Sequence, residues 1–259
     1  MSVKFVILGS GSSMGVPRAD GYSGNCDLRN KKNFRTRCSA LIKFDNQNIL
    51  IDTSPDLRTQ LLQNKIKNIS RVFYTHLHAD QTHGINDLRP FFLINKKQIP
   101  VYADNLTAKY LLSTFGYCFK SSHGYPSTLK INSLKNKHMF INKNKKILIE
   151  SIPVEHGKIK SVCYIINKKL AYASDISLFF KKDYKRLKKI DYLIIDCLWY
   201  RNHSAHFNLE QVLDIVNILL PKKTILTNMH TDLDYNQLKK KLPKNIVPGY
   251  DGMTVNLQY

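Results

Sequence analysis

The sequence predicts a layered α/β fold, in which sheets are covered by helices. Short apolar runs typical of buried strands alternate with amphipathic stretches of helical period, and strands interleaved with helices form such layers. The chain has 259 residues, 43% of them hydrophobic, which is enough to bury a substantial core. The strand-like runs are residues 3–8, 38–44, 48–52, 71–75, 146–152, 162–166, 169–173, 191–196 and 223–227.

The first predicted strand runs directly into a glycine-rich loop at residues 9–15. After the strand at 48–52, Pro55 is expected at the first position of a helix, because its missing N–H costs nothing there. Leu57, Leu61 and Leu62 follow at helical spacing and are predicted to form its apolar face.

A clearer helix is predicted at residues 208–220, near the end of the chain. Asn208 is a suitable N-cap residue, and Pro221 ends the helix. Its apolar face consists of Leu209, Val212, Leu213, Val216, Leu219 and Leu220.

We predict a single domain over residues 1–259, because no repeat and no long low-complexity linker interrupts the chain. The segment 115–145 contains Gly, Ser, Pro and Lys with weak periodicity. It is predicted to be a lid or an inserted loop.

The sequence favours a cytoplasmic protein with no membrane partner. No apolar run approaches the roughly 20 residues that span a bilayer. The apolar run at 3–8 is too short for a signal peptide. The five cysteines are odd in number, widely spaced and form no C-x-x-C pair, which indicates reduced thiols.

The net charge of +21, from 40 Lys and Arg against 19 Asp and Glu, is the strongest compositional feature. Such an excess attracts phosphate-bearing substrates or polyanions such as nucleic acid. Compositional drift toward Lys, Asn and Ile gives the same excess without any partner. Both interpretations stay open, with a nucleic acid kept as an alternative partner.

The stretch YTHLHADQTHG at residues 74–84 carries a predicted metal site. His76, His78 and Asp80 follow a buried strand, and Zn²⁺ and similar ions accept imidazole nitrogen and carboxylate oxygen. His83 is interpreted either as a further ligand, as a support for the ligands or as a helix-surface residue.

Three more candidate ligands lie far along the chain, each after an apolar run. They are His156, Asp175 and His230. Ligands of open α/β folds collect at strand ends, so this distribution predicts one shared site.

The order of these motifs resembles the metallo-β-lactamase superfamily, whose pattern is His-x-His-x-Asp-His, then His, Asp and His. Further stretches are similar to one branch of it, the phosphodiesterases of phosphonate breakdown. These stretches are GSGSSMGVPR at 9–18, RTRCSALI at 35–42, LIDTSPDLRTQLL at 50–62, HGINDLR at 83–89 and TNMHTDLDY at 227–235. The resemblance implies a four-layer αββα sandwich with metals at one edge.

The resemblance also implies which residues hold the metals. One ion is assigned to His76, His78 and His156, and Asp175 bridges to a second ion held by Asp80 and His230. Gln81 stands where the family has an imidazole, and an amide oxygen is a weaker donor. We therefore expect Zn²⁺ or Mn²⁺, with one ion bound tightly and the second more weakly, and Gln81 as a poor ligand or a support.

His206 matches the position of the branch's catalytic histidine, and it is predicted to protonate the leaving oxygen. Asp80 is counted with it among the catalytic residues. Asp52 and Asp196 each end an apolar strand. They are interpreted either as acceptors of a ligand histidine's second N–H or as turn-forming residues.

The loop residues Ser10, Gly11 and Ser12 are candidates for substrate binding, because backbone N–H groups of such a loop can hold a phosphate. A tight turn without ligand explains the glycines equally well. The branch often has a zinc-binding run of cysteines after this loop, but only Cys26 is retained here, so a structural zinc is not expected.

The predicted reaction is metal-assisted hydrolysis of a phosphodiester that is small, cyclic or nucleotide-like. Two alternatives are kept: a tRNA-processing endonuclease of the same superfamily, and an inactive metal-holding protein that binds nucleic acid. A homodimer is also left open. The sequence does not name the substrate or the metal.

Overall fold

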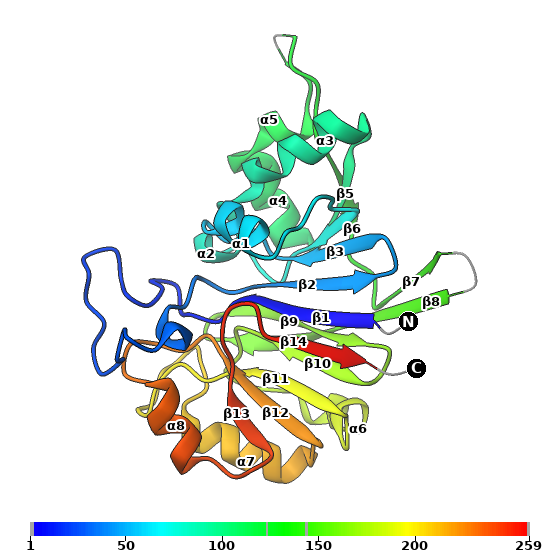
Figure 1. Cartoon of the computed structure of the whole chain (residues 1–259). Coiled ribbons are helices and arrows are strands. Elements are labelled where there is room, and N and C mark those ends of the chain that lie inside the picture. The colour runs from blue at the N-terminus through cyan, green and yellow to red at the C-terminus, as the bar shows by residue number, and fades with distance from the viewer. Residues whose placement is uncertain (1–2, 123, 143–144, 258–259) are drawn as a thin grey trace. The chain divides into compact units, whose positions relative to one another are not determined.

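The computed structural model describes residues 3–122, 124–142 and 145–257, and it divides the chain into two compact units. The first unit comprises residues 1–8, 39–135 and 254–259, and the second comprises residues 9–38 and 136–253. In the described part of the chain, each unit contains one seven-stranded sheet (Figure 1).

The sheet of the first unit is mixed, with strand order β14-β1-β2-β3-β4-β5-β6. Strands β3 to β6 run parallel, whereas β1 pairs with β14, and β2 with β3, in antiparallel fashion. The strands are β1 (Val3–Gly9), β2 (Ser39–Phe44), β3 (Gln47–Ile51), β4 (Arg71–Phe73), β5 (Ile99–Ala103), β6 (Leu129–Ser133) and β14 (Thr254–Leu257).

The helices of the first unit pack an apolar core against this sheet. Leu57 of α1, Phe91 of α3 and Leu111 of α4 join buried strand residues such as Leu50 and Val72 in one cluster. The helices are α1 (Leu57–Gln63), α2 (Ala79–Thr82), the 3-10 helix η2 (Ile85–Leu88), α3 (Arg89–Asn95), α4 (Asn105–Thr114) and α5 (Gly116–Phe119).

The sheet of the second unit has the order β13-β12-β11-β10-β9-β8-β7. Strands β7 to β10 are antiparallel neighbours, and β10 to β13 are parallel. The strands are β7 (Lys137–Asn142), β8 (Lys145–His156), β9 (Ile159–Ile166), β10 (Leu170–Ala173), β11 (Tyr192–Asp196), β12 (Lys223–Thr227) and β13 (Ile246–Pro248).

Helices also cover one face of this second sheet. Leu187, Val216 and Leu238, from three different helices, share a core cluster with Ile165 and Ile195 of the strands. The helices are η1 (Lys31–Asn33), η3 (Lys181–Asp183), α6 (Tyr184–Leu187), α7 (Leu209–Leu219) and α8 (Tyr235–Lys241).

Helix α7 confirms the prediction for residues 208–220. Asn208 and Gln211 form a capping box, in which each side chain accepts a hydrogen bond from the other's backbone N–H. Leu220 adopts the left-handed conformation at the C-terminal end, and Pro221 follows it.

Helix α1 begins at Leu57, so the prediction that Pro55 opens it was wrong by two residues. The Ser54 hydroxyl accepts the Asp56 N–H, and the Ser54 carbonyl accepts the Leu57 N–H, which makes a turn of these residues. Leu62 is 64% exposed and lies outside the buried face.

The segment 115–145, for which the composition favours a lid or an inserted loop, contains regular secondary structure. It contains α5, β6 and β7, while residues 123 and 143–144 lie outside the described residues. Side chains of β7 alternate between exposed and half-buried, and Met139 and Ile141 are among the exposed ones, so no alternation of apolar and polar residues marks this edge strand in the sequence. None of the helices in the described part of the chain has the length and apolarity that crossing a bilayer requires.

Candidate functional site

The parallel pairing of β3 and β4 brings two polar residues of the first unit together. Ile51 lies opposite Phe73, so Asp52 and Thr75 emerge at the same edge of the sheet. Thr75 donates its backbone N–H and its hydroxyl to the two Asp52 oxygens, each at 2.8 Å. Asp52 is fully buried, so these two donors compensate its loss of water.

His76 is oriented by this pair. Its Nδ1 lies 3.1 Å from the Thr75 hydroxyl, which already donates to Asp52, so Nδ1–H is the donor and Nε2 keeps its lone pair. The His76 Nε2 lies 3.0 Å from the His78 Nδ1. The predicted role of Asp52 is therefore carried out through Thr75, which fixes the tautomer of a candidate ligand.

Asp80 and Gln81 lie in the first turn of α2, directly after His78. The Gln81 side-chain amide nitrogen donates to Asp80 Oδ2 at 3.1 Å, and the Gln81 backbone carbonyl accepts the Thr53 N–H at 2.7 Å. Gln81 is fully buried, and its hydrogen bond to Oδ2 orients the Asp80 carboxylate.

His83, the C-terminal cap of α2, is exposed. Its Nδ1 lies 3.1 Å from the Ala79 carbonyl oxygen, and its ring meets Phe115 edge-on at 5.3 Å between centroids. Of the roles considered for His83, this geometry favours a helix-surface one.

The second unit gathers its candidates at the ends of three parallel strands. Ala173 lies opposite Ile195, and Asp196 lies opposite Thr227, so Asp175, Asp196 and Asn228 leave the sheet at one edge. Burial of these residues is nearly complete, with exposed fractions of 2%, 0% and 1%.

Asp196 holds His206. Its Oδ2 lies 2.6 Å from the His206 Nδ1 and also accepts the Ile176 N–H at 3.0 Å. Burial raises the pKa of Asp196 to about 7, against the opposing effect of the His206 charge. The expected partner of Asp196 was a ligand histidine, whereas the structure pairs it with the predicted general acid.

His156, the last residue of β8, lies beside the same edge. Its Nδ1–H donates to the Ala205 carbonyl at 2.7 Å, which leaves the Nε2 lone pair for a metal. Ligand atoms of His156, Asp175 and His206 all lie within 4.8 Å of one another. The described residues of the second unit therefore contain a three-residue group able to hold a cation.

Asn228 was missed by sequence reasoning. Its backbone is left-handed, with φ of 59°, which Asn tolerates better than most residues. Its amide donates to the Ser174 carbonyl at 2.8 Å and to Asp175 Oδ1 at 3.1 Å, and lies 3.3 Å from the His206 Nδ1. Its place directly after an apolar strand was the available signal.

His230 stands in a different environment. Its Nδ1 lies 3.0 Å from the Thr231 hydroxyl, and its ring meets Trp199 edge-on at 5.0 Å. Burial lowers the pKa of His230, which favours the neutral imidazole that a metal requires. Among the described residues, His230 is not part of the cation-holding group of the second unit.

A family model described as the beta-lactamase superfamily domain matches residues 47–229. The chain belongs to the metallo-β-lactamase superfamily. Its two mixed sheets with flanking helices match the αββα sandwich of this superfamily, which confirms the predicted fold class.

Solved structures support this membership. A diphosphatase of the PhnP family is 28% identical, with a TM-score of 0.88 over 99% of this chain and 98% of that one. Zn²⁺-bound PqqB from Methylobacterium extorquens has a TM-score of 0.76 at 16% identity, over 98% and 100% of the two chains. The short form of human tRNase Z has a TM-score of 0.69 at 16% identity, over 99% of this chain and 100% of that one. At this low identity, the likeness to PqqB and to tRNase Z shows the fold alone.

A curated relative from Porphyromonas gingivalis, named octanoyltransferase, is 30% identical over 257 residues. The match covers 97% of this chain and 51% of that protein, so the chain spans about half the length of this relative.

The donor chemistry of both units fits the metal that the superfamily uses. Imidazole nitrogens and carboxylate oxygens suit Zn²⁺ and Mn²⁺. Thr75 and the Ala205 carbonyl take up the Nδ1–H of His76 and His156, so both rings present the lone pair that binds metal.

Of the two interpretations of the Ser10, Gly11 and Ser12 loop, substrate binding or a tight turn, the backbone hydrogen bonds favour the turn. The Ser10 N–H donates to Asp251, the Gly11 N–H to the Thr36 carbonyl and the Ser12 N–H to the Met229 carbonyl. Because all three N–H groups are used within the protein, the loop is held as a structural turn.

Proposed function

We propose that this protein is a metal-dependent phosphodiesterase that hydrolyses small phosphodiesters of cyclic or nucleotide-like type. The observation that carries the proposal is His206, which Asp196 holds beside the candidate ligand Asp175. This arrangement supplies a positioned proton donor next to a candidate metal ligand. The similarity to a PhnP-family diphosphatase over nearly the whole chain supports a phosphate ester as substrate.

The metal ligands in this proposal are those that the superfamily's motif order implies. They are His76, His78, Asp80, His156, Asp175 and His230. The bound metal supplies Lewis-acid stabilisation of charge on the phosphoryl oxygens and lowers the pKa of water. Zn²⁺ and Mn²⁺ are the candidates, with the second ion more weakly held because Gln81 replaces an imidazole.

His206 acts on the leaving group. Its side chain is 16% exposed, so it reaches solvent, while the Asp196 side chain is completely buried. Because Nδ1 is engaged by Asp196, the nitrogen that gives its proton to the leaving oxygen is Nε2. Before this transfer the His206 imidazole is protonated, and Asp196 stabilises that charged form.

A tRNA-processing endonuclease is the second candidate, and the net charge of +21 favours it. The human tRNase Z likeness adds the fold only. The octanoyltransferase name is not carried over, because the chain spans about half of that protein. All five cysteines of this chain are also buried, so none offers an exposed thiol for acyl transfer.

The deciding experiment compares substrates for the purified protein with added Zn²⁺ or Mn²⁺. Bis(p-nitrophenyl) phosphate, cyclic nucleotides and a precursor tRNA are assayed in parallel, with His206→Ala as the control for contaminating activity. We expect turnover of small diesters, changing only modestly between low and physiological salt. Efficient trimming of the precursor tRNA, with binding that weakens steeply as salt rises, would instead establish the second candidate.

A further inference from the structure

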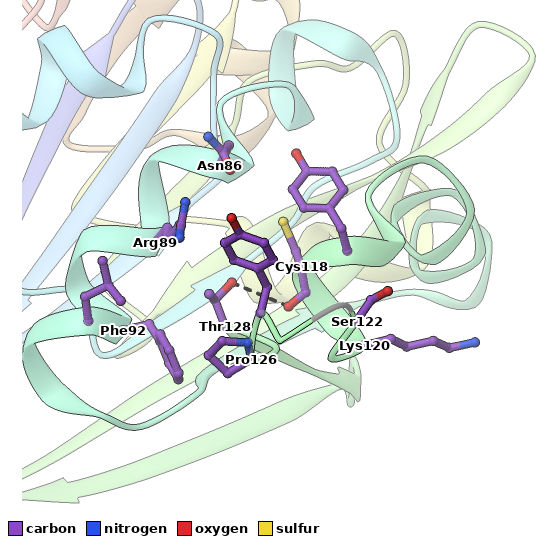
Figure 2. Close-up of a pocket in the computed structure, with 11 residues that line it drawn as sticks. Asn86, Arg89, Phe92, Cys118, Lys120, Ser122, Pro126 and Thr128 are labelled. Carbon is purple, nitrogen blue, oxygen red and sulfur yellow. Dashed lines mark hydrogen bonds between the residues drawn. The ribbon is translucent and has the colours of Figure 1, made fainter.

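The first unit contains a cavity of about 380 Å³ whose lining residues have no role in the proposed hydrolysis. It is formed by η2, the start of α3, α5 and the chain that leads into β6 (Figure 2). Its volume falls within the range of small-molecule sites in proteins, roughly 300–1,000 Å³. The cavity therefore has the size of a ligand site.

Cations and amides line part of this cavity. Asn86 and Arg89 are three positions apart, at the junction of η2 and α3. Residues at this spacing share one face of a 3-10 turn. Figure 2 shows Asn86 and Arg89 on one side of the cavity, with Lys120 and Ser122 on the other. None of the described residues that line it is acidic.

Aromatic rings supply the rest of the wall. Tyr117 and Tyr125 are 59% and 66% exposed although they line a cavity, so their rings are accessible to a ligand. The Arg89 guanidinium lies 5.6 Å from the centre of the Tyr125 ring. Two mutual backbone hydrogen bonds of 3.0 and 2.9 Å join Ser122 to Tyr125.

We propose that this cavity binds a ligand that combines a phosphate with a planar aromatic base, the chemistry of a nucleotide. An Arg guanidinium binds phosphate through two parallel hydrogen bonds, and an exposed tyrosine ring stacks on a base. The Arg89 and Tyr125 side chains are adjacent, so one ligand reaches both. The inference does not depend on the proposed hydrolysis.

The test is isothermal titration calorimetry on the full-length protein, carried out with the metal bound and again after metal removal with EDTA. The probes are 5′-AMP, adenosine, inorganic phosphate and a tetramer of adenylate. We expect 5′-AMP to bind at least tenfold more tightly than adenosine or phosphate, because only AMP offers both groups. A tetramer that binds more tightly than AMP identifies a nucleic-acid strand as the source of the ligand, and equal affinity identifies the free nucleotide.

Variants locate the binding. Arg89→Gln and Tyr125→Leu are each expected to weaken AMP binding about tenfold, as loss of a charge-assisted hydrogen bond or a stacking ring does. Both residues are exposed, so their replacement should leave the fold intact. The matched controls are Arg58→Gln, on the exposed side of α1, and Tyr22→Leu, which lies in the second unit.

Two results overturn the proposal. The first is an equal loss of AMP affinity in Arg89→Gln and Arg58→Gln, which would indicate a diffuse response to positive charge. The second is AMP binding that His78→Ala abolishes while Arg89→Gln leaves it intact, since this would assign the nucleotide to the metal motif.

Discussion

Asp196 Oδ2 and His206 Nδ1 lie 2.6 Å apart, and the carboxylate that makes this contact is completely buried. A buried carboxylate is costly unless donors compensate it, and here the Ile176 N–H is the second donor to the same oxygen. The pair therefore fixes both the tautomer and the direction of the His206 ring. It also joins β11 to the loop that precedes α7, so the catalytic geometry depends on the packing of the second unit.

Replacing His206 by Ala separates catalysis from metal binding. Turnover of diesters is expected to fall by roughly two to four orders of magnitude, because a general acid contributes about that much. Metal content should stay as in the wild type, since the proposal gives His206 no ligand role. Turnover and metal analysis on the same preparation check both points.

Leaving-group dependence provides the control for His206→Ala. The p-nitrophenolate leaving group needs little protonation, so turnover of p-nitrophenyl diesters should fall less in His206→Ala than turnover of alkyl diesters. An equal loss for both would indicate substrate positioning instead, and loss of bound metal would show that His206 joins His156 and Asp175 as a ligand.

Asn228 is expected to position both His206 and Asp175. Asn228→Gly keeps the left-handed backbone and removes the side chain whose amide donates to Asp175 and to the Ser174 carbonyl. We expect about a 10- to 100-fold loss of activity or metal affinity, the range found when supporting contacts of metal ligands are removed. Dialysis against a metal chelator, followed by metal analysis and kinetics, measures both. Wild-type values for both would show that the Asn228 amide is dispensable.

The N-cap of α7 links stability to the catalytic loop. Asn208→Ala removes the acceptor of the Gln211 N–H and should lower the free energy of unfolding by about 1 kcal/mol. Asn208→Ser keeps a capping oxygen and should retain most of the stability. Urea denaturation of the three proteins checks this, and equal midpoints for Ala and Ser would show that the cap contributes little.

The lowered pKa of Asp234 implies that the free energy of unfolding falls at acid pH. Burial raises its pKa, but hydrogen bonds from Gln237, Asp27 and Asn33 outweigh this and hold the pKa below its usual value. A lowered folded-state pKa gives stability that is present above about pH 4 and is lost as the pH falls through the folded value. Asp234→Asn keeps a cap for α8 without this titration.

We therefore expect the wild type to lose more stability than Asp234→Asn between pH 5 and pH 3, measured by urea denaturation. Asp234→Ala should be less stable than both at pH 7, because it also lacks the α8 cap. Parallel pH curves for wild type and Asp234→Asn would contradict the assigned pKa shift.

The sequence predicted those parts of the fold that depend on local pattern. Apolar runs located nine of the strands to within a few residues, and the Asn208 cap located α7. The missed strands are β5, β6, β7, β13 and β14. β14 pairs with β1 across the whole chain, and β7 is an edge strand in which Met139 and Ile141 are exposed, so no alternation of apolar and polar residues marks it.

The same distinction applies to the candidate site. His76, His78 and Asp80 are close in sequence, so their grouping was visible as a motif. The partners of the Ser10–Ser12 loop come from Thr36, Met229 and Asp251, and no local pattern reveals that these acceptors take its N–H groups. Asn228 was hidden for the same reason, because its contacts with Asp175 and His206 arise from strand pairing.

Gln81 provides the last prediction. Its amide donates to Asp80, so it orients a carboxylate where the superfamily has a metal-binding imidazole. An imidazole is the stronger donor for Zn²⁺, so Gln81→His should tighten the second ion by roughly one to two orders of magnitude. Metal analysis after exhaustive dialysis should find close to one ion per wild-type chain and closer to two per Gln81→His chain.

Gln81→Leu is the matched control, because it fills the same buried position without any donor or acceptor. It should retain the single tight ion, since His76, His78 and His156 are unchanged, and it should bind the second ion no better than the wild type. If the wild type already keeps two ions through dialysis, then Gln81 or His83 is an adequate ligand and the second site is not weakened.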